Sequence, residues 1–276
     1  MALASSPAVP APPEAAAPAE PVTPPAVRRW VDSALEDLAR GRLEAAASKL
    51  RLARWSFPQD LESGLLLAWI EAAQGRWAEA ARTVQALPLD GRPAAWRLSA
   101  WGLAGMAYRR TGDPAAAARA LRQALDADPR AGLVHEEMGR LALAAELDPK
   151  TAERLAPAWP GSRPGSPADW RAAAEGQLRE AVRLAPERVD AYLVLAQSLM
   201  DAGRWADAAE LLKQANRVDH LLPEIHDLLG QAYEHLDQLP AAIAEYRRAL
   251  ELDPQYLPAR RHLERLQPEA PAASRP

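Results

Sequence analysis

Apolar and polar residues follow one another along the chain with the spacing of amphipathic helices, in a unit that recurs about every 34 residues. A Gly-Arg pair followed by an alanine-rich run begins at Gly41, Gly75 and Gly203, and Asp237 holds the same place 34 residues after Gly203. This period predicts six pairs of short helices between residues 27 and 256, each pair joined by a tight turn.

Equivalent places in the six units carry the same kinds of side chain. The first helix of each unit has a small residue, at Ala34, Ala68, Gly105, Gly139, Ala196 and Gly230. In the second helix an alanine precedes a bulky residue by four places, in Ala46–Leu50, Ala80–Val84, Ala117–Leu121, Ala174–Leu178, Ala208–Leu212 and Ala242–Tyr246. Prolines follow the second helix at Pro58, Pro129, Pro186 and Pro254. Small residues allow close helix packing and proline ends a helix, so the pattern predicts stacked helix pairs.

This pattern resembles the tetratricopeptide repeat, whose motif runs W-x2-L-G-x2-Y, A-x3-F and P over 34 residues. The last unit is the closest copy, with Gly230, Tyr233, Ala242, Tyr246 and Pro254 in the motif positions. The resemblance covers six repeats over residues 27–256 and implies an all-α, right-handed superhelical solenoid of antiparallel helix pairs. Residues 256–267 have the pattern of one more amphipathic helix, which we expect to cap the last repeat.

Two places depart from the period. The connection at residues 87–93 is three residues longer than its equivalents, and we expect it to change only the local superhelix. Repeat four contains an insertion at about residues 147–167, rich in proline and glycine, with room for one short helical turn at 150–156. The insertion is either a tolerated surface loop or a contact loop, in which Trp159 touches the array or a partner.

The two ends differ from the repeat region in composition. Residues 1–26 are rich in proline and alanine, and we expect a disordered spacer there, with a second disordered tail at 268–276. The solenoid is therefore predicted to span residues 27–267. The compartment stays open between cytoplasm and periplasm, and the periplasm is favoured if Met1 replaces a removed signal. No stretch is apolar enough to predict a direct membrane span.

Composition and motifs argue against a catalytic, metal or nucleic-acid site in this chain. The formal net charge is −4 and cysteine is absent, so neither a nucleic-acid surface nor a thiolate site is expected. There is no glycine-rich phosphate loop, G-x-S-x-G or H-E-x-x-H motif. A histidine cluster of His220, His226 and His235 is the one alternative for a metal. We therefore expect no catalytic residue, no metal and no cofactor.

The resemblance implies a binding surface, because the first helices of such arrays line a concave groove that holds peptide segments. The groove positions are Leu35, Trp69, Met106, Arg109, Glu136, Arg140, Gln197, Asp227, Gln231 and Glu234. Their N-terminal half is apolar with arginine and their C-terminal half is polar and acidic, which favours a bipartite ligand. The Lys and Asn of the chaperone-tail clamp are missing, so a co-chaperone is not expected.

The sequence thus predicts a non-catalytic protein–protein interaction scaffold that binds a protein or peptide partner. One alternative is a bacterial envelope-assembly adaptor, for secretion, pilus or polysaccharide export, tethered by the N-terminal spacer. A second alternative is the regulatory module of a separate enzyme.

Overall fold

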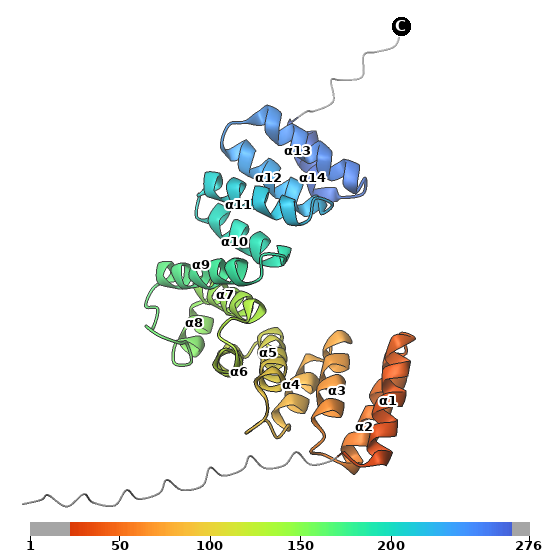
Figure 1. Cartoon of the computed structure of the whole chain (residues 1–276). Coiled ribbons are helices and arrows are strands. Elements are labelled where there is room, and N and C mark those ends of the chain that lie inside the picture. The colour runs from red at the N-terminus through yellow and green to blue at the C-terminus, as the bar shows by residue number, and fades with distance from the viewer. Residues whose placement is uncertain (1–22, 267–276) are drawn as a thin grey trace, which may run out of the picture.

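The computed structural model describes residues 23–266, which form fourteen α-helices and no strand (Figure 1). The predicted all-α class is confirmed. The helices are α1 (Pro25–Ala39), α2 (Leu43–Ser56), α3 (Leu61–Ala73), α4 (Trp77–Gln85), α5 (Ala94–Arg110), α6 (Pro114–Ala127), α7 (Gly132–Leu147), α8 (Pro149–Leu155), α9 (Pro167–Leu184), α10 (Val189–Asp201), α11 (Trp205–Val218), α12 (Pro223–His235), α13 (Leu239–Leu252) and α14 (Leu257–Leu266).

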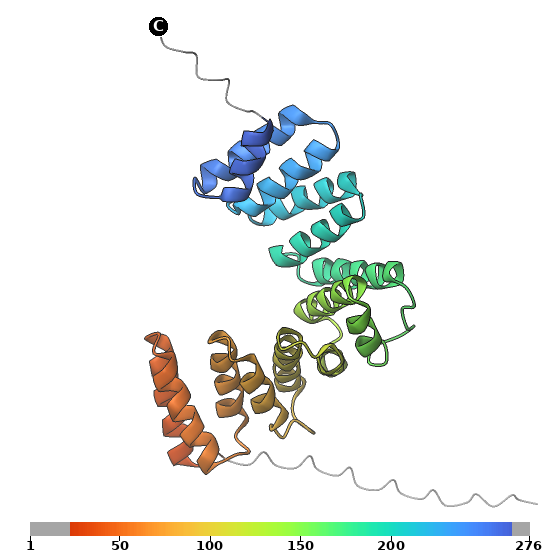
Figure 2. The ribbon, with the colours of Figure 1, turned by 180° about the vertical axis from the view of Figure 1, so that it is seen from behind.

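Successive helices pack as antiparallel pairs and build a bent array with α1 at one end and α14 at the other (Figures 1 and 2). The pairs are α1/α2, α3/α4, α5/α6, α7/α9, α10/α11 and α12/α13, and α14 packs on α13 as the predicted cap. Each second helix except α13 also contacts the first helix of the next repeat. The array is therefore the predicted superhelical solenoid, in which every repeat covers the apolar face of its neighbour.

The turns within the pairs have the backbone geometry that the repeated glycines predict. Gly41, Gly75, Gly112 and Gly203 have φ angles between 72° and 77°, in the left-handed region that glycine adopts without strain. Asp237 takes the same place in the last repeat with φ of 57°, and it is the one non-glycine residue with positive φ among residues 23–266. Aspartate tolerates this conformation better than most side chains, so the last repeat keeps the same turn without a glycine.

The repeated small and bulky positions form the core. Ala46, Ala117 and Ala208 have no exposed surface, and neither do Leu50, Leu121 or Leu212. At Gly105 an added Cβ would lie 2.4 Å from Leu121 Cδ2, so the helices approach as closely as glycine permits. Small residues in the first helix thus seat the bulky side chain of the second, as the sequence pattern predicts.

The insertion of repeat four is partly helical and belongs to the core. Helix α8 lies where the short helical turn is expected, and its N-terminus is capped by Asp148, whose side chain accepts from the Thr151 backbone N–H at 3.0 Å. Trp159, after α8, is only 8% exposed and meets the Trp170 ring edge-to-face at 5.2 Å. Of the two interpretations of Trp159, contact with the array is the one observed, since burial leaves little of the ring for a partner.

The longer connection between repeats two and three also changes a helix. The first helices α7, α10 and α12 begin three residues before the position of His135, Tyr192 and His226, which are equivalent in the repeat. Helix α5 begins seven residues before the equivalent Trp101. The longer connection therefore comes with about one extra helical turn at the N-terminus of α5. The sequence alone predicts that the connection changes only the local superhelix.

The described helices begin and end near the two ends of the repeat region. Helix α1 begins at Pro25, two residues before the expected start, and α14 ends at Leu266. Most of the expected spacer and all of the expected tail, residues 1–22 and 268–276, lie outside the described residues. Within residues 23–266 no helix is both long and apolar enough to cross a lipid bilayer.

Candidate functional site

The first helices of the repeats lie on the inner side of the bend. From repeat two onward they contact one another in succession, α3 with α5, α5 with α7, α7 with α10 and α10 with α12. No two successive second helices come into comparable contact in the described part of the chain. The array therefore curves around its first helices, and their exposed side chains form the inner surface on which the predicted groove residues lie.

An apolar pocket of about 320 Å³ opens between α3 and α5. Trp69 is 46% exposed there, although it is one of the largest apolar side chains of the array. Its neighbours in the lining are Glu62, Leu65, Leu66, Ala95, Trp96 and Ser99. A concave site lined by aromatic and aliphatic side chains with a few polar groups is the usual form of a binding pocket.

Trp96 was not among the predicted groove residues. It lies in the extra N-terminal turn of α5, ahead of the positions that the 34-residue period places on the groove. The signal available in the sequence was the longer connection at residues 87–93, because a longer connection can lengthen the next helix. The pocket thus depends on a residue outside the regular repeat. Assigning groove positions by the 34-residue spacing alone misses that residue.

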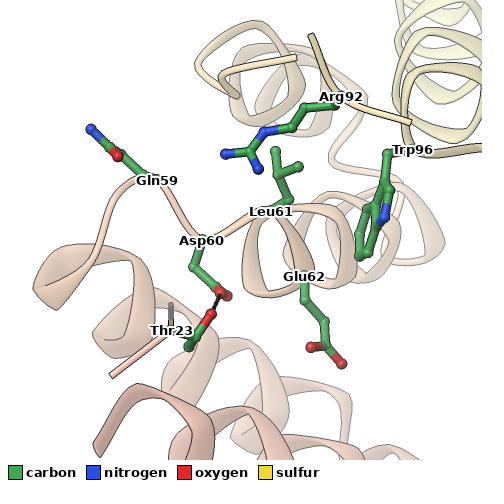
Figure 3. Close-up of a pocket in the computed structure, with 7 residues that line it drawn as sticks. All are labelled: Thr23, Gln59, Asp60, Leu61, Glu62, Arg92 and Trp96. Atoms are coloured by element: carbon green, nitrogen blue, oxygen red, sulfur yellow. Dashed lines mark hydrogen bonds between the residues drawn. The ribbon is translucent and has the colours of Figure 1, made fainter. Parts of the chain in front are cut away.

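A smaller, polar pocket of about 150 Å³ adjoins the apolar one at the N-terminal end of α3 (Figure 3). Both pockets are lined by Glu62 and Trp96. The rest of the polar lining is Thr23, Gln59, Asp60, Leu61 and Arg92. Asp60 caps α3 by accepting from the Ser63 backbone N–H at 2.8 Å, and it also accepts from the Thr23 hydroxyl at 2.8 Å.

Each predicted charged position of the middle repeats forms an ion pair. Arg109 Nε donates to Glu137 Oε2 at 2.6 Å across the α5–α7 interface. Glu136 is buried between Arg140 at 2.9 Å and Arg188 at 3.1 Å. A partner could use these charges only by breaking buried ion pairs, which is costly because the remaining charge stays buried.

The polar positions at the C-terminal end are also engaged. Gln231 donates to Asp227 at 3.0 Å. Glu234 accepts from Arg265 of the capping helix at 2.5 and 2.7 Å, and Arg265 and the Tyr246 hydroxyl hold the pKa of Glu234 below its usual value. Asp227 is buried. Asp227 and Glu234 thus already have partners from α12, α13 and α14, and an acidic groove at this end of the array stays a prediction from the sequence.

Gln197 lies in a third pocket, of about 290 Å³, between α7 and α10. The pocket has an apolar wall of Leu143, Leu147 and Val194, and Leu147 is largely exposed. Gln197 itself donates to Asp201 at 2.8 Å. Met106 is half-buried against the core of repeats two and three. Of the predicted groove residues, Trp69 and Gln197 thus line pockets, whereas the charged positions form the network between repeats.

Burial of Asp227 leads to a pH prediction. Desolvation raises the pKa of its carboxyl group, so ionised Asp227 lowers the free energy of unfolding at pH values above the folded-state pKa, and this penalty fades as pH falls toward the unfolded value. The isosteric Asp227→Asn variant should be more stable than the natural chain at pH 7 by urea unfolding. The difference should shrink at pH 4. Equal differences at the two pH values would contradict the raised pKa.

Two of the three candidate histidines, His226 and His235, contact side chains of the array. His226 Nδ1 lies 2.7 Å from Glu245 Oε2, and the His235 ring stacks on Trp205 with centroids 3.7 Å apart. Among residues 23–266 no group of three or more histidine, aspartate or glutamate side chains is placed to hold a metal ion.

Comparison with protein-family models identifies the repeats. Two models described as tetratricopeptide repeat match the chain, one over residues 171–217 and 194–256 and the other over residues 98–141. A search of curated proteins finds no match.

Solved structures share the fold at low sequence identity. PilW, a type IV pilus biogenesis factor, is 17% identical with a TM-score of 0.65, covering 87% of this chain and 99% of that one. PilF of Pseudomonas aeruginosa is 16% identical with a TM-score of 0.61, covering 87% and 97%. The Cut9–Hcn1 structure is 15% identical with a TM-score of 0.62, and the match covers 87% of this chain but only 42% of that one.

Tetratricopeptide arrays bind protein or peptide partners and are generally non-catalytic scaffolds. The six helix pairs, the glycine turns and the matches to two family models agree on one assignment. This chain belongs to the tetratricopeptide repeat family.

Proposed function

We propose that the chain is a non-catalytic scaffold that binds an extended partner segment along the inner surface of repeats one to three. The partner's apolar side chain inserts between Trp69 and Trp96. The observation that supports this site is the exposed Trp69 ring on an apolar pocket of about 320 Å³.

Physical chemistry favours this pocket over the rest of the inner surface. Aromatic side chains in central pockets contribute most of the binding free energy in many interfaces, because they desolvate a large apolar area at little cost in side-chain entropy. The charged groups of repeats three and four are already paired, so a partner gains little from them. The pocket between α7 and α10 offers a second apolar contact further along the same surface.

The groove residues can be tested with matched tryptophan variants. Trp69→Ala should weaken partner binding about 30-fold, the effect of losing about 2 kcal/mol at a hot spot. Trp55, on α2, is 83% exposed and lines none of the three pockets described above, so Trp55→Ala should leave binding unchanged. The measurement is quantitative affinity capture from native lysate, followed by titration of the captured partner. Equal capture by Trp69→Ala and the natural chain would refute the site.

A narrower role, as an envelope-assembly adaptor, is a second candidate. It is supported by PilW and PilF, whose chains match this one over nearly their whole length, although at their identity the likeness concerns the fold. Crosslinking in native cells, followed by identification of partners bound through Trp69, tests it. Partners confined to cytoplasmic enzymes would reject this role and favour the regulatory module, which otherwise stays a prediction from the sequence.

A further inference from the structure

Helix α14 lies against the last repeat at the C-terminal end of the array (Figure 1). The guanidinium group of Arg265 donates to both carboxylate oxygens of Glu234 on α12, at 2.5 and 2.7 Å. The His262 ring stacks on Tyr246 of α13, with centroids 5.0 Å apart. Glu234 is one of the predicted groove positions, so α14 engages a side chain that the groove would offer to a ligand.

Helix α14 and the helix that it pairs with have opposite charge. Helix α14 carries three arginines against one glutamate, whereas α12 carries Glu224, Asp227 and Glu234 and no lysine or arginine. Burial raises the pKa of Tyr256, the residue before α14, to about 12, and the charges of Asp227 and Glu224 add to the rise. The acidic groups of α12 therefore act on the segment that docks there, and such a surface favours a basic helix.

The attachment of α14 is weaker than that of the repeat helices. Within α14, all of which the structure describes, only Ala259 is buried, while Leu263 and Leu266 are partly buried. The Arg265 side chain is 55% exposed, so its ion pair with Glu234 is screened by water. Segments with few buried apolar contacts open at low free energy. Helix α14 can thus leave while the repeats stay folded.

Asp227 shows that α14 does not satisfy the whole surface. One carboxylate oxygen, Oδ2, accepts from Gln231 at 3.0 Å, but Oδ1 is buried and has no hydrogen-bond donor. Burial raises the pKa of Asp227, and His262 of α14 opposes that rise through its charge. A helix with lysine in the place of His262 would bring a permanent cation to this carboxylate, which forms a stronger hydrogen bond.

We propose that α14 is a built-in ligand of an interaction surface on α12 and α13, and that a basic amphipathic helix of a partner protein replaces it there. The partner's helix carries arginine in the place of Arg265, to pair with Glu234, and lysine in the place of His262, to donate to Asp227. This surface lies on the last repeat and the pocket of Trp69 on repeats two and three. The inference therefore goes beyond the proposed function and does not depend on it.

The short connection to α14 sets how strongly a partner must bind. Residues 253–256 join α13 to α14. A ligand attached through a short connection has an effective concentration in the millimolar range, so α14 fills the surface in most molecules even if its own affinity is low. The apparent affinity of a partner falls by the fraction of molecules in which the surface is open. The donor to Asp227 gives the partner the advantage that it needs.

Displacement of α14 is tested by titrating full-length chains with a labelled peptide of residues 255–266, QYLPARRHLERL. Arg265→Glu puts a carboxylate against Glu234, so α14 should undock, and the peptide should bind on the order of tenfold more tightly than to the natural chain. Arg261 is exposed, so Arg261→Glu makes the same change of charge and should leave the affinity at its natural value. Equal affinity for all three chains, or absent binding to all of them, would overturn the proposal.

Hydrogen exchange distinguishes a displaceable ligand from a structural part of the fold. In Arg265→Glu the amides of residues 257–266 should exchange faster than in the natural chain, and those of α10 and α11 should exchange at the same rate. Faster exchange throughout the array would mean that α14 cannot leave without unfolding the repeats, which contradicts the proposal.

The role of Asp227 is tested with a second peptide that carries His262→Lys. Its affinity for the Arg265→Glu chain should fall on the order of tenfold when Asp227→Asn is added, while the unchanged peptide should lose much less. Equal losses for the two peptides would refute the predicted contact with Asp227.

Two controls fix the place and the source of the ligand. Trp69→Ala should not alter peptide binding, so failure of this surface and failure of the Trp69 pocket are distinguishable. Light scattering of the natural chain should show a monomer. Dimers that disappear in Arg265→Glu would reject the partner, because α14 of a second copy would then fill the surface.

Discussion

Replacing Trp170 by alanine should lower the free energy of unfolding by about 3–5 kcal/mol, the usual cost of removing a large aromatic side chain from a core. Trp170 lies in the first turns of α9, is 2% exposed and meets Trp159 edge-to-face. Leu155 of α8 belongs to the same buried cluster. The substitution therefore opens a cavity and also removes the contact that holds the end of the insertion.

Urea unfolding followed by circular dichroism measures this effect, with Trp55→Ala as the matched control. Trp55 is 83% exposed, so its replacement should change the free energy of unfolding by less than about 0.5 kcal/mol. Equal losses in the two variants would mean that Trp170 is not the anchor of repeat four. Proteolysis of Trp170→Ala should moreover begin in residues 156–166, because α8 and Trp159 lose the surface on which they pack.

The repeat could be predicted from the sequence because each of its features has a local cause. A glycine at every turn is required by the positive φ angle, and Asp237 meets the same requirement. Alanine and glycine in the helices are required by the close approach of a bulky side chain from the paired helix. Such requirements recur in every unit, so the same pattern appears six times in one sequence.

The parts that escaped prediction depend on contacts between repeats. Whether Glu136 is open to a ligand is decided by Arg188, which lies 52 residues away along the chain. Whether Trp159 faces solvent is decided by Trp170 on the helix beyond the insertion. The period predicts which helix face each residue occupies, but it does not predict which neighbour covers that face.

This difference also explains why the proposed site is confined to the N-terminal repeats, whereas the predicted groove residues extend to the last repeat. From the sequence alone, an arginine or glutamate on the groove face is as good a candidate for partner contact as a tryptophan. In the structure the charged residues join consecutive first helices, as Arg109 and Glu137 do across α5 and α7. These charges are already paired, so we expect a partner to gain more binding free energy from apolar surface, above all at the pocket beside Trp69.

Replacing Gly230 by leucine should lower the free energy of unfolding by about 3 kcal/mol, the upper part of the range for overpacking a core. Even a Cβ at this position would lie 2.5 Å from Cε1 of Tyr246. The ring has no room to move, because Tyr246 is fully buried, its hydroxyl donates to Glu234 at 3.1 Å and its ring stacks on His262. The capping helix α14 contributes His262, so the clash should loosen the cap as well.

Gly176 provides the control with the opposite sign. It lies in the interior of α9, is exposed, and an added Cβ would meet no atom within 4 Å. Gly176→Leu should therefore raise the free energy of unfolding by about 0.5–1 kcal/mol, since leucine is the better helix former. Thermal and urea unfolding of the two variants measure the contrast. Stabilisation of both variants would show that helix propensity, rather than the contact with Tyr246, determines the effect of replacing Gly230.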